Sequence, residues 1–367
     1  MNFVKKMTGV AVLAAVSSVA FADCSSPLSS YAWYMANGDQ ASANQIAQNH
    51  PECFAGGAAT SNASINATAF SQVSAISSVI SARFSNVAAG PSGLASAGLN
   101  KGLAAGGKAQ SWNMWANVEK NDTDLDYKTG TRLVTGSNDI VTTVLGADYT
   151  FSPALVGGVS VAFDNGDGRG KTVNTAFPFT RNQNDTGSDG FLIAPYVGYQ
   201  LSKEFVLDAT VGLGKGNYSA TGGVKAEADR WFAATNLSYN RWMGNVQLTG
   251  KLSYLHGEED YGDTKVNGAA VAKTGATNKL DQIRLGVQAG YWVNGFMPYA
   301  GLGYSNNVNR ESDAGKDPLG RDTFLATIGV NFFGMNSKIT GGLAYTQELN
   351  RDHSDNQIFS GNINFRF

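Results

Sequence analysis

The sequence predicts an all-β fold, a transmembrane antiparallel up-and-down β-barrel of about 12 strands with an N-terminal α-helical segment in the lumen. Three observations predict this fold. Apolar residues alternate with polar ones along most of the chain after Ser111. Short and long connections alternate between these segments, and several segments have aromatic residues at both ends. All three are typical of a barrel wall that faces lipid on one side.

The alternating segments number twelve from Trp112 onward, and the clearest are residues 141–151, 191–199, 231–239, 324–332 and 359–367. Short turns are expected at 152–154, 202–204, 243–244, 293–295 and 334–336, and longer polar loops near 119–138, 165–188, 215–228, 256–279, 306–321 and 347–356. Outer-membrane barrels have short periplasmic turns and long outer loops. We therefore expect a bacterial outer-membrane location, with both termini periplasmic or with the N-terminus in the lumen.

Aromatic residues on the apolar face recur eight positions apart, in the pairs Phe191/Tyr199, Trp231/Tyr239, Phe296/Tyr304, Phe324/Phe332 and Phe359/Phe367. Eight residues span about 26 Å of strand, and a tilt of about 40–45° reduces this to roughly 20 Å along the membrane normal. That distance fits an apolar band between two aromatic girdles. The weaker alternative is a soluble sandwich with these aromatic pairs buried between its two sheets.

The two faces of the predicted strands differ in chemistry. We expect lipid contact for Leu145, Val161, Ile193, Val211, Leu237, Leu285, Ile328 and Ile363. The opposite face has ionisable residues, namely Asp148, Asp208, Lys251, Arg284, Lys338 and Arg366. A charge facing lipid in mid-membrane would cost about 2–4 kcal/mol. These charges are therefore expected to face the lumen.

The first 22 residues have the pattern of a signal peptide. Lys5 and Lys6 precede an uncharged apolar run, and Ala20-Phe21-Ala22 is a small-x-small cleavage site. The apolar run is too short for a retained transmembrane helix.

The formal charge of −2 and the absence of a basic stripe argue against binding of nucleic acid. Charged residues make up 15% of the chain, whereas about 25% is usual for soluble domains.

We divide the chain into a signal peptide (1–22), a small disulfide-linked segment (23–63), a helical linker or plug (64–110) and the barrel (111–367). Cys24 and Cys53 are the only cysteines, and export to an oxidising compartment favours a disulfide between them. A metal-binding or reactive pair is rejected, since no cluster of further ligands accompanies them. Between the cysteines, residues 31–36 and 40–48 are expected to form two short helices around the turn at 37–39.

The linker contains a predicted helix whose apolar residues recur at steps of three and four. The residues assigned to this plug helix are Phe70, Val73, Ile76, Ile80, Arg83 and Phe84. Its many small residues would let it fit within a lumen, where Arg83 could pair with Asp148 or Asp208. The alternative is a helix in the periplasm beneath an open channel.

No enzymatic activity, metal or cofactor is predicted. His353 lies between Asp352 and Asp355, and His256 precedes several acidic residues, but neither fits a catalytic motif. Residues 164–168 contain Asp, Asn and Gly, which are more common in ordinary turns than in calcium sites. Phosphate-binding, zinc and serine-hydrolase motifs are absent from the sequence.

Several segments together resemble the translocator domain of the autotransporter (type V secretion) family. They are residues 70–76, 102–107, 112–118, 145–149, 152–159, 298–302 and the C-terminal Phe365-Arg366-Phe367. The last strand has its glycine at Gly361, one position before the place the family would have it. The resemblance implies a barrel with a passenger that is very short or vestigial here.

The resemblance also implies partners. They are outer-membrane lipids, periplasmic chaperones and the barrel assembly machinery, with Phe365 and Phe367 as the C-terminal assembly signal. Two other functions stay open: a surface-binding protein, such as an adhesin or receptor, that acts through its outer loops, and a diffusion pore. The sequence does not indicate a surface ligand.

Overall fold

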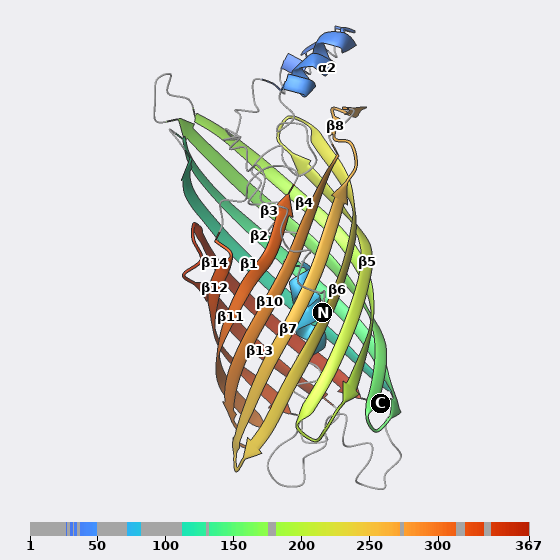
Figure 1. Ribbon diagram of the computed structural model, residues 1–367, viewed down its shortest axis with the longest axis vertical. Coiled ribbons are helices and arrows are strands. Elements are labelled where there is room, and N and C mark those ends of the chain that lie inside the picture. Colours follow the sequence, from blue (N-terminus) through green and yellow to red (C-terminus); the bar gives the residue numbers. More distant parts are fainter. Residues whose placement is uncertain are drawn as a thin grey trace, which may run out of the picture.

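The computed structural model describes residues 27, 30–31, 33–34, 37–49, 72–81, 112–129, 132–174, 181–271, 275–312, 320–333 and 339–366. Twelve strands of this part of the chain form a closed antiparallel barrel, which confirms the predicted fold (Figure 1). They are β1 (Trp112–Thr129), β2 (Arg132–Ser152), β3 (Leu155–Asn174), β4 (Arg181–Gln200), β5 (Phe205–Ala220), β6 (Val224–Met243), β7 (Val246–Tyr261), β10 (Ala276–Tyr291), β11 (Phe296–Ser312), β12 (Asp322–Phe333), β13 (Ile339–Leu349) and β14 (Ser354–Arg366).

Each barrel strand pairs with its neighbours along the chain, and β1 closes the barrel against β14. This closing register runs from Asn113↔Arg366 to Leu125↔Ser354. Between β7 and β10, a short hairpin of β8 (Lys265–Val266) and β9 (Ala269–Ala270) extends the N-terminal end of β6. Closure leaves the barrel wall without an unpaired sheet edge.

The strand pleat separates an apolar outer face from the lumen. Leu145, Ile193, Val211, Leu285 and Ile328 are 47–63% exposed, and they lie on the outer face. Val161, Leu237 and Ile363 lie on the same face and are half-buried. The large apolar side chains are exposed on this surface because lipid, not water, is their solvent.

The predicted long loops are mostly strand, so that part of the prediction was wrong. The β1–β2 ladder continues past Lys120↔Val141 and Asp122↔Asp139 to Thr129↔Arg132. Residues 164–168, expected to be a turn, lie within β3. Above the apolar band the outer face meets water and becomes polar, so apolar alternation fades although backbone pairing continues.

The short turns are confirmed between β2 and β3, β4 and β5, β6 and β7, and β10 and β11. Gly244 and Gly295 have positive φ values of 61° and 91°, which glycine adopts without strain. The fifth predicted turn, at 334–336, lies outside the described residues. We call this end of the barrel the short-turn end, and the opposite end the long-strand end.

A small helical unit packs at the long-strand end (Figure 1). Helix α2 (Gln40–Asn49) begins after Asp39, whose carboxylate accepts hydrogen bonds from the Ser42 amide and hydroxyl at 3.1 and 2.7 Å. These bonds hold the pKa of Asp39 below its usual value. Tyr31 and Ala43 are buried with Val224, Val266 and Val271, from β6 and from around the β8–β9 hairpin.

The predicted second helix at 40–48 is therefore confirmed as α2. Of the predicted first helix, residues 31, 33 and 34 are described and helical. The signal peptide, Cys24 and Cys53 lie outside the described residues. No helix among the described residues is long and apolar enough to cross a membrane.

Candidate functional site in the barrel lumen

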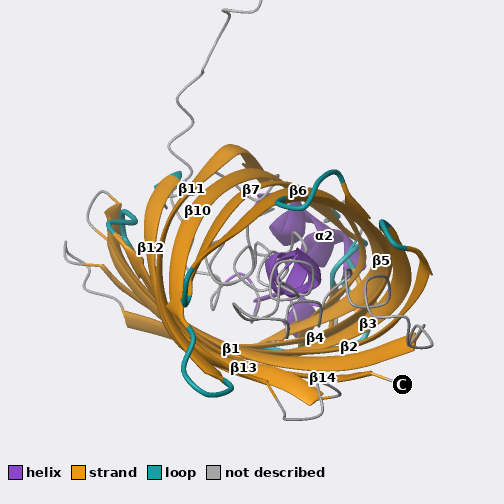
Figure 2. Cartoon of the chain, turned by 90° about the horizontal axis from the view of Figure 1, so that it is seen from below, coloured by secondary structure: helices purple, strands orange, loops and turns teal. Residues whose placement is uncertain are grey.

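A helical segment, residues 72–81, lies inside the barrel, as predicted (Figure 2). Val73, Ile76 and Ile80 follow the three- and four-residue steps of one helix face, and each is at most 4% exposed. These three side chains belong to one buried apolar cluster with residues of the barrel wall. The predicted plug residues Phe70, Arg83 and Phe84 lie outside the described residues.

The wall that receives this helix is apolar on its inner face. The cluster's wall residues come mainly from β2–β7 and include Val144, Ala162, Leu192, Ala194, Val206, Phe232, Ala234 and Leu255. The Phe232 ring lies against Gly212, where an added Cβ would meet it at 2.0 Å. Lumens of such barrels are ordinarily polar. This apolar half of the lumen is therefore the docking surface of the helix.

The sequence contains a signal for this surface. In β4, Leu192, Ala194 and Tyr196 alternate with the outward Ile193, so the strand is apolar on both faces. In β10, by contrast, Gln282, Arg284 and Gln288 occupy the lumen face. Apolar residues on both faces indicate a strand that is buried on both sides.

A buried polar network holds the first turn of the helix to the wall. The Arg230 guanidinium donates to Asp164 at 3.0 and 3.2 Å and to Glu259 at 2.6 Å. Gln72 donates to Asp164 and accepts from Arg230 at 3.4 Å. The Tyr261 hydroxyl donates to Glu259 at 2.7 Å. The network places one cation between two carboxylates, and all five side chains have charge-assisted bonds.

A second polar group lies nearer the short-turn end. Asp148 is 1% exposed and accepts hydrogen bonds from Asn113 at 2.8 Å and Tyr196 at 3.0 Å. The Tyr196 hydroxyl in turn accepts from the Trp115 indole at 2.8 Å. Asp208, also 1% exposed, accepts from Asn236 at 2.6 Å. Both carboxylates therefore have partners from the wall itself.

The structure places the other predicted lumen charges as follows. Lys251 and Arg284 occupy lumen positions of β7 and β10, and Arg366 follows the outward Phe365 at a lumen position of β14. Lys338 lies outside the described residues. At the C-terminus, Phe365 is 37% exposed on the outer face of β14, and Phe367 lies outside the described residues.

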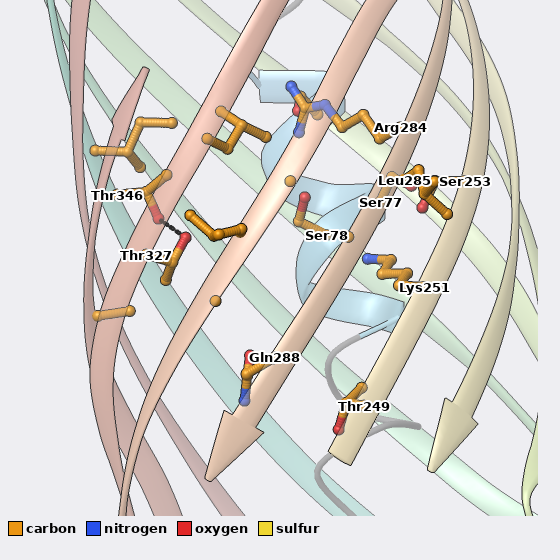
Figure 3. A pocket seen from close by; sticks show the side chains of 18 of the residues that line it. Ser77, Ser78, Thr249, Lys251, Ser253, Arg284, Leu285, Gln288, Thr327 and Thr346 are labelled. Carbon is orange, nitrogen blue, oxygen red and sulfur yellow. Dashed lines mark hydrogen bonds between the residues drawn. The ribbon is translucent and has the colours of Figure 1, made fainter. Parts of the chain in front are cut away.

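A cavity of about 320 Å³ remains beside the helix, on the side away from the apolar half (Figure 3). Ser74, Ser77 and Ser78 form its helical wall. The rest of its lining comes from β1, β6, β7 and β10–β14. The helix is thus amphipathic, with an apolar face on the docking surface and a serine face toward the cavity.

The two histidines in the described part of the chain do not form a lumen site. The His353 ring contacts the Asp126 carbonyl at 3.0 Å, and His256 pairs with Asp281 at 2.7 Å on the outer face. Tyr254 also donates to Asp281, at 2.7 Å. Within the described part of the chain, no group of three His, Cys, Asp or Glu residues could hold a metal ion.

Taken together, a closed twelve-stranded barrel with an apolar outer face and a helix in its lumen defines a translocator-type outer-membrane barrel. The family model described as the autotransporter β-domain matches residues 114–346. The chain belongs to the autotransporter β-domain family, and this membership places the barrel in the outer membrane.

Solved structures agree on the fold. The translocator domain of NalP from Neisseria meningitidis is 13% identical, with a TM-score of 0.53 over 80% of this chain and 97% of that domain. The β-domain of Bordetella BrkA is 12% identical, with a TM-score of 0.54 over 70% and 100%. The transport unit of AIDA-I from Escherichia coli is 13% identical, with a TM-score of 0.51 over 73% and 95%. A comparison with curated proteins finds no similar sequence.

Proposed function

We propose that this barrel anchors and displays its own short N-terminal segment at the cell surface. One observation supports the proposal above the others, namely the path of the chain. Residues 37–49 lie at the long-strand end, residues 72–81 lie in the lumen, and β1 begins at the short-turn end. A chain that follows this path passes through its own barrel.

The orientation follows from the lengths of the connections. Short turns of such barrels face the periplasm, and long strands and loops project outward. The C-terminal strand would then end in the periplasm, and α2 would lie outside the cell. This proposal differs from the sequence-based expectation, in which the N-terminus was periplasmic or in the lumen. Residues 1–22, 23–63, 64–110 and 111–367 would act as leader, displayed segment, plug and barrel.

An epitope tag tests this orientation. A tag inserted between Asn37 and Gly38, an exposed turn, is expected to bind antibody on intact cells. A matched tag between Gly244 and Asn245, in a short turn, is expected to bind only after the outer membrane is permeabilised. Labelling of the first tag only after permeabilisation would contradict surface display.

A disulfide between Cys24 and Cys53 would stabilise the displayed segment. A small unit of this kind has little apolar core of its own, and closing a loop of this length contributes about 3 kcal/mol. Purified, non-reduced protein is expected to react with a thiol reagent only after reduction. Two reactive thiols in the non-reduced protein would refute the disulfide, and a C24S/C53S variant gives the background signal.

Assembly of the barrel would depend on its C-terminal strand. Phe365 and Phe367 have the alternating aromatic pattern expected of a signal for the barrel assembly machinery, and periplasmic chaperones would deliver the unfolded chain. The outward position of Phe365 is consistent with recognition of this strand before β14 pairs with β1.

A further inference from the structure

The lumen cavity beside the helix exists because part of the wall has no side chains there. Gly286, Gly301 and Gly303 line it from β10 and β11. An added Cβ at Gly286 would meet only the Leu302 carbonyl, at 3.8 Å. On the other side, the serine face of the helix has only short side chains. Liquid water occupies about 30 Å³ per molecule, so about 320 Å³ accommodates a hydrated ion.

Three ionisable residues line this cavity, namely Glu119, Lys251 and Arg284. Lys251 faces the lumen because the adjacent Leu252 lies on the outer face, and neighbouring strand residues point to opposite faces. Arg284 faces the lumen for the same reason, since the adjacent Leu285 lies on the outer face. In the register of β7 and β10, Lys251 lies opposite Gly286, and Arg284 lies opposite Ser253. The two cations are therefore diagonal neighbours on the lumen face. The Cα atoms of such diagonal neighbours lie about 7 Å apart.

Where the chain is described, neither cation has a carboxylate within ion-pair distance, unlike Arg230 and Arg351. Arg230 pairs with Asp164 and Glu259, and Arg351 pairs with Glu348 at 2.8 Å. Among the described residues, no carboxylate oxygen lies within 4.0 Å of the side-chain nitrogens of Lys251 or Arg284. Arg284 donates one hydrogen bond within the described part of the chain, to the Ser305 hydroxyl at 3.4 Å.

The surrounding carboxylates do not cancel this charge at the cavity wall. Among the described residues that line the cavity, Glu119 is the one acidic residue, against two cations. Asp208 attracts Lys251, and Glu348 and Glu119 attract Arg284. Asp208 and Glu348 do not line the cavity, and their carboxylates bind Asn236 and Arg351. The remaining lining combines apolar residues and glycines with Ser, Thr, Gln and Asn side chains, whose hydroxyl and amide groups can donate hydrogen bonds to an anion.

We propose that this cavity is a path for small inorganic anions through the plugged barrel, with Lys251 and Arg284 as its selectivity-determining residues. Figure 3 shows both side chains reaching from their strands toward the helix. An anion between them would be attracted by two cations that have no described carboxylate within ion-pair distance, while a cation would be repelled. The path is independent of whether the N-terminal segment is displayed.

The test is a reversal-potential measurement on the full-length protein in planar bilayers. The probe is KCl at about 0.1 M on one side and about 0.01 M on the other, where screening is weak. The small conductance of the full-length protein is expected to favour chloride over potassium by about threefold. The K251Q/R284Q variant should lose the preference for chloride or favour potassium. In this variant the acidic Glu119 still lines the cavity, whereas both cations have been removed.

Two control variants separate charge from general damage. R284K keeps the positive charge and should keep the preference for chloride. K279Q removes a cation from the outer face, where Lys279 lies 3.5 Å from Glu258, and should change nothing. A potassium preference, a full-length protein without conductance, or an unchanged preference in K251Q/R284Q would overturn the proposal. Failure of the surface-tag test would leave it intact.

Discussion

Deletion of residues 64–110 is expected to convert a poorly conducting protein into an open pore. The full-length chain should give small, rare conductance steps in planar bilayers, and the deletion should give large, stable openings. The reason is geometric: a helix with its side chains is about 10 Å across, and residues 72–81 are packed against the wall of the lumen. Its removal would join the helix volume and the remaining cavity.

Point variants make the same test without a large deletion. Ile76 is fully buried against the docking surface, and I76D would place a charge there. We expect I76D to release the helix and to raise the frequency of large openings. S78A changes the cavity face of the same helix and should leave the helix docked. If the full-length protein conducts as freely as the deletion, the plug is wrong and a diffusion pore becomes the better description.

Replacement of Arg230 by methionine is expected to destabilise the barrel by about 3–5 kcal/mol, because it leaves buried carboxylates without their cation. Asp164 and Glu259 have side chains that are at most 1% exposed and bind Arg230 directly. The free energy of unfolding can be measured by urea titration of the refolded protein in micelles. Gln72 would also lose a partner, so the first turn of the helix should loosen.

The matched control is K215Q. Lys215 and Asp229 form an exposed pair at 2.9 Å on β5 and β6, and breaking such a pair costs less than about 1 kcal/mol. Combining R230M with D164N and E259Q removes the uncompensated charges and should recover much of the stability. If R230M and K215Q lower the free energy of unfolding equally, the buried network contributes no more to stability than an exposed pair.

Local sequence pattern determined which face of each strand meets lipid. Leu285 and Arg284 are adjacent, and period-two geometry alone requires opposite faces for them. The helix at 72–81 and helix α2 were also predictable, since three- and four-residue steps and a capping Asp39 are local signals. The length of the strands beyond the lipid could not be predicted from the sequence. Their outer faces are polar there, and backbone pairing leaves no mark in the sequence.

Only the tertiary structure decided which lumen residues meet. Asp164 and Arg230 lie 66 positions apart, and Gln72 lies 92 positions before Asp164. Their contact depends on barrel closure and on the stagger of neighbouring strands, which pair residues as distant as Asn113 and Arg366. The same closure brings Val144, Leu192 and Phe232 onto one side of the lumen and leaves Lys251 and Arg284 beside the cavity. A period of two assigns each side chain to a face, whereas its partners across the lumen depend on how the whole sheet curves.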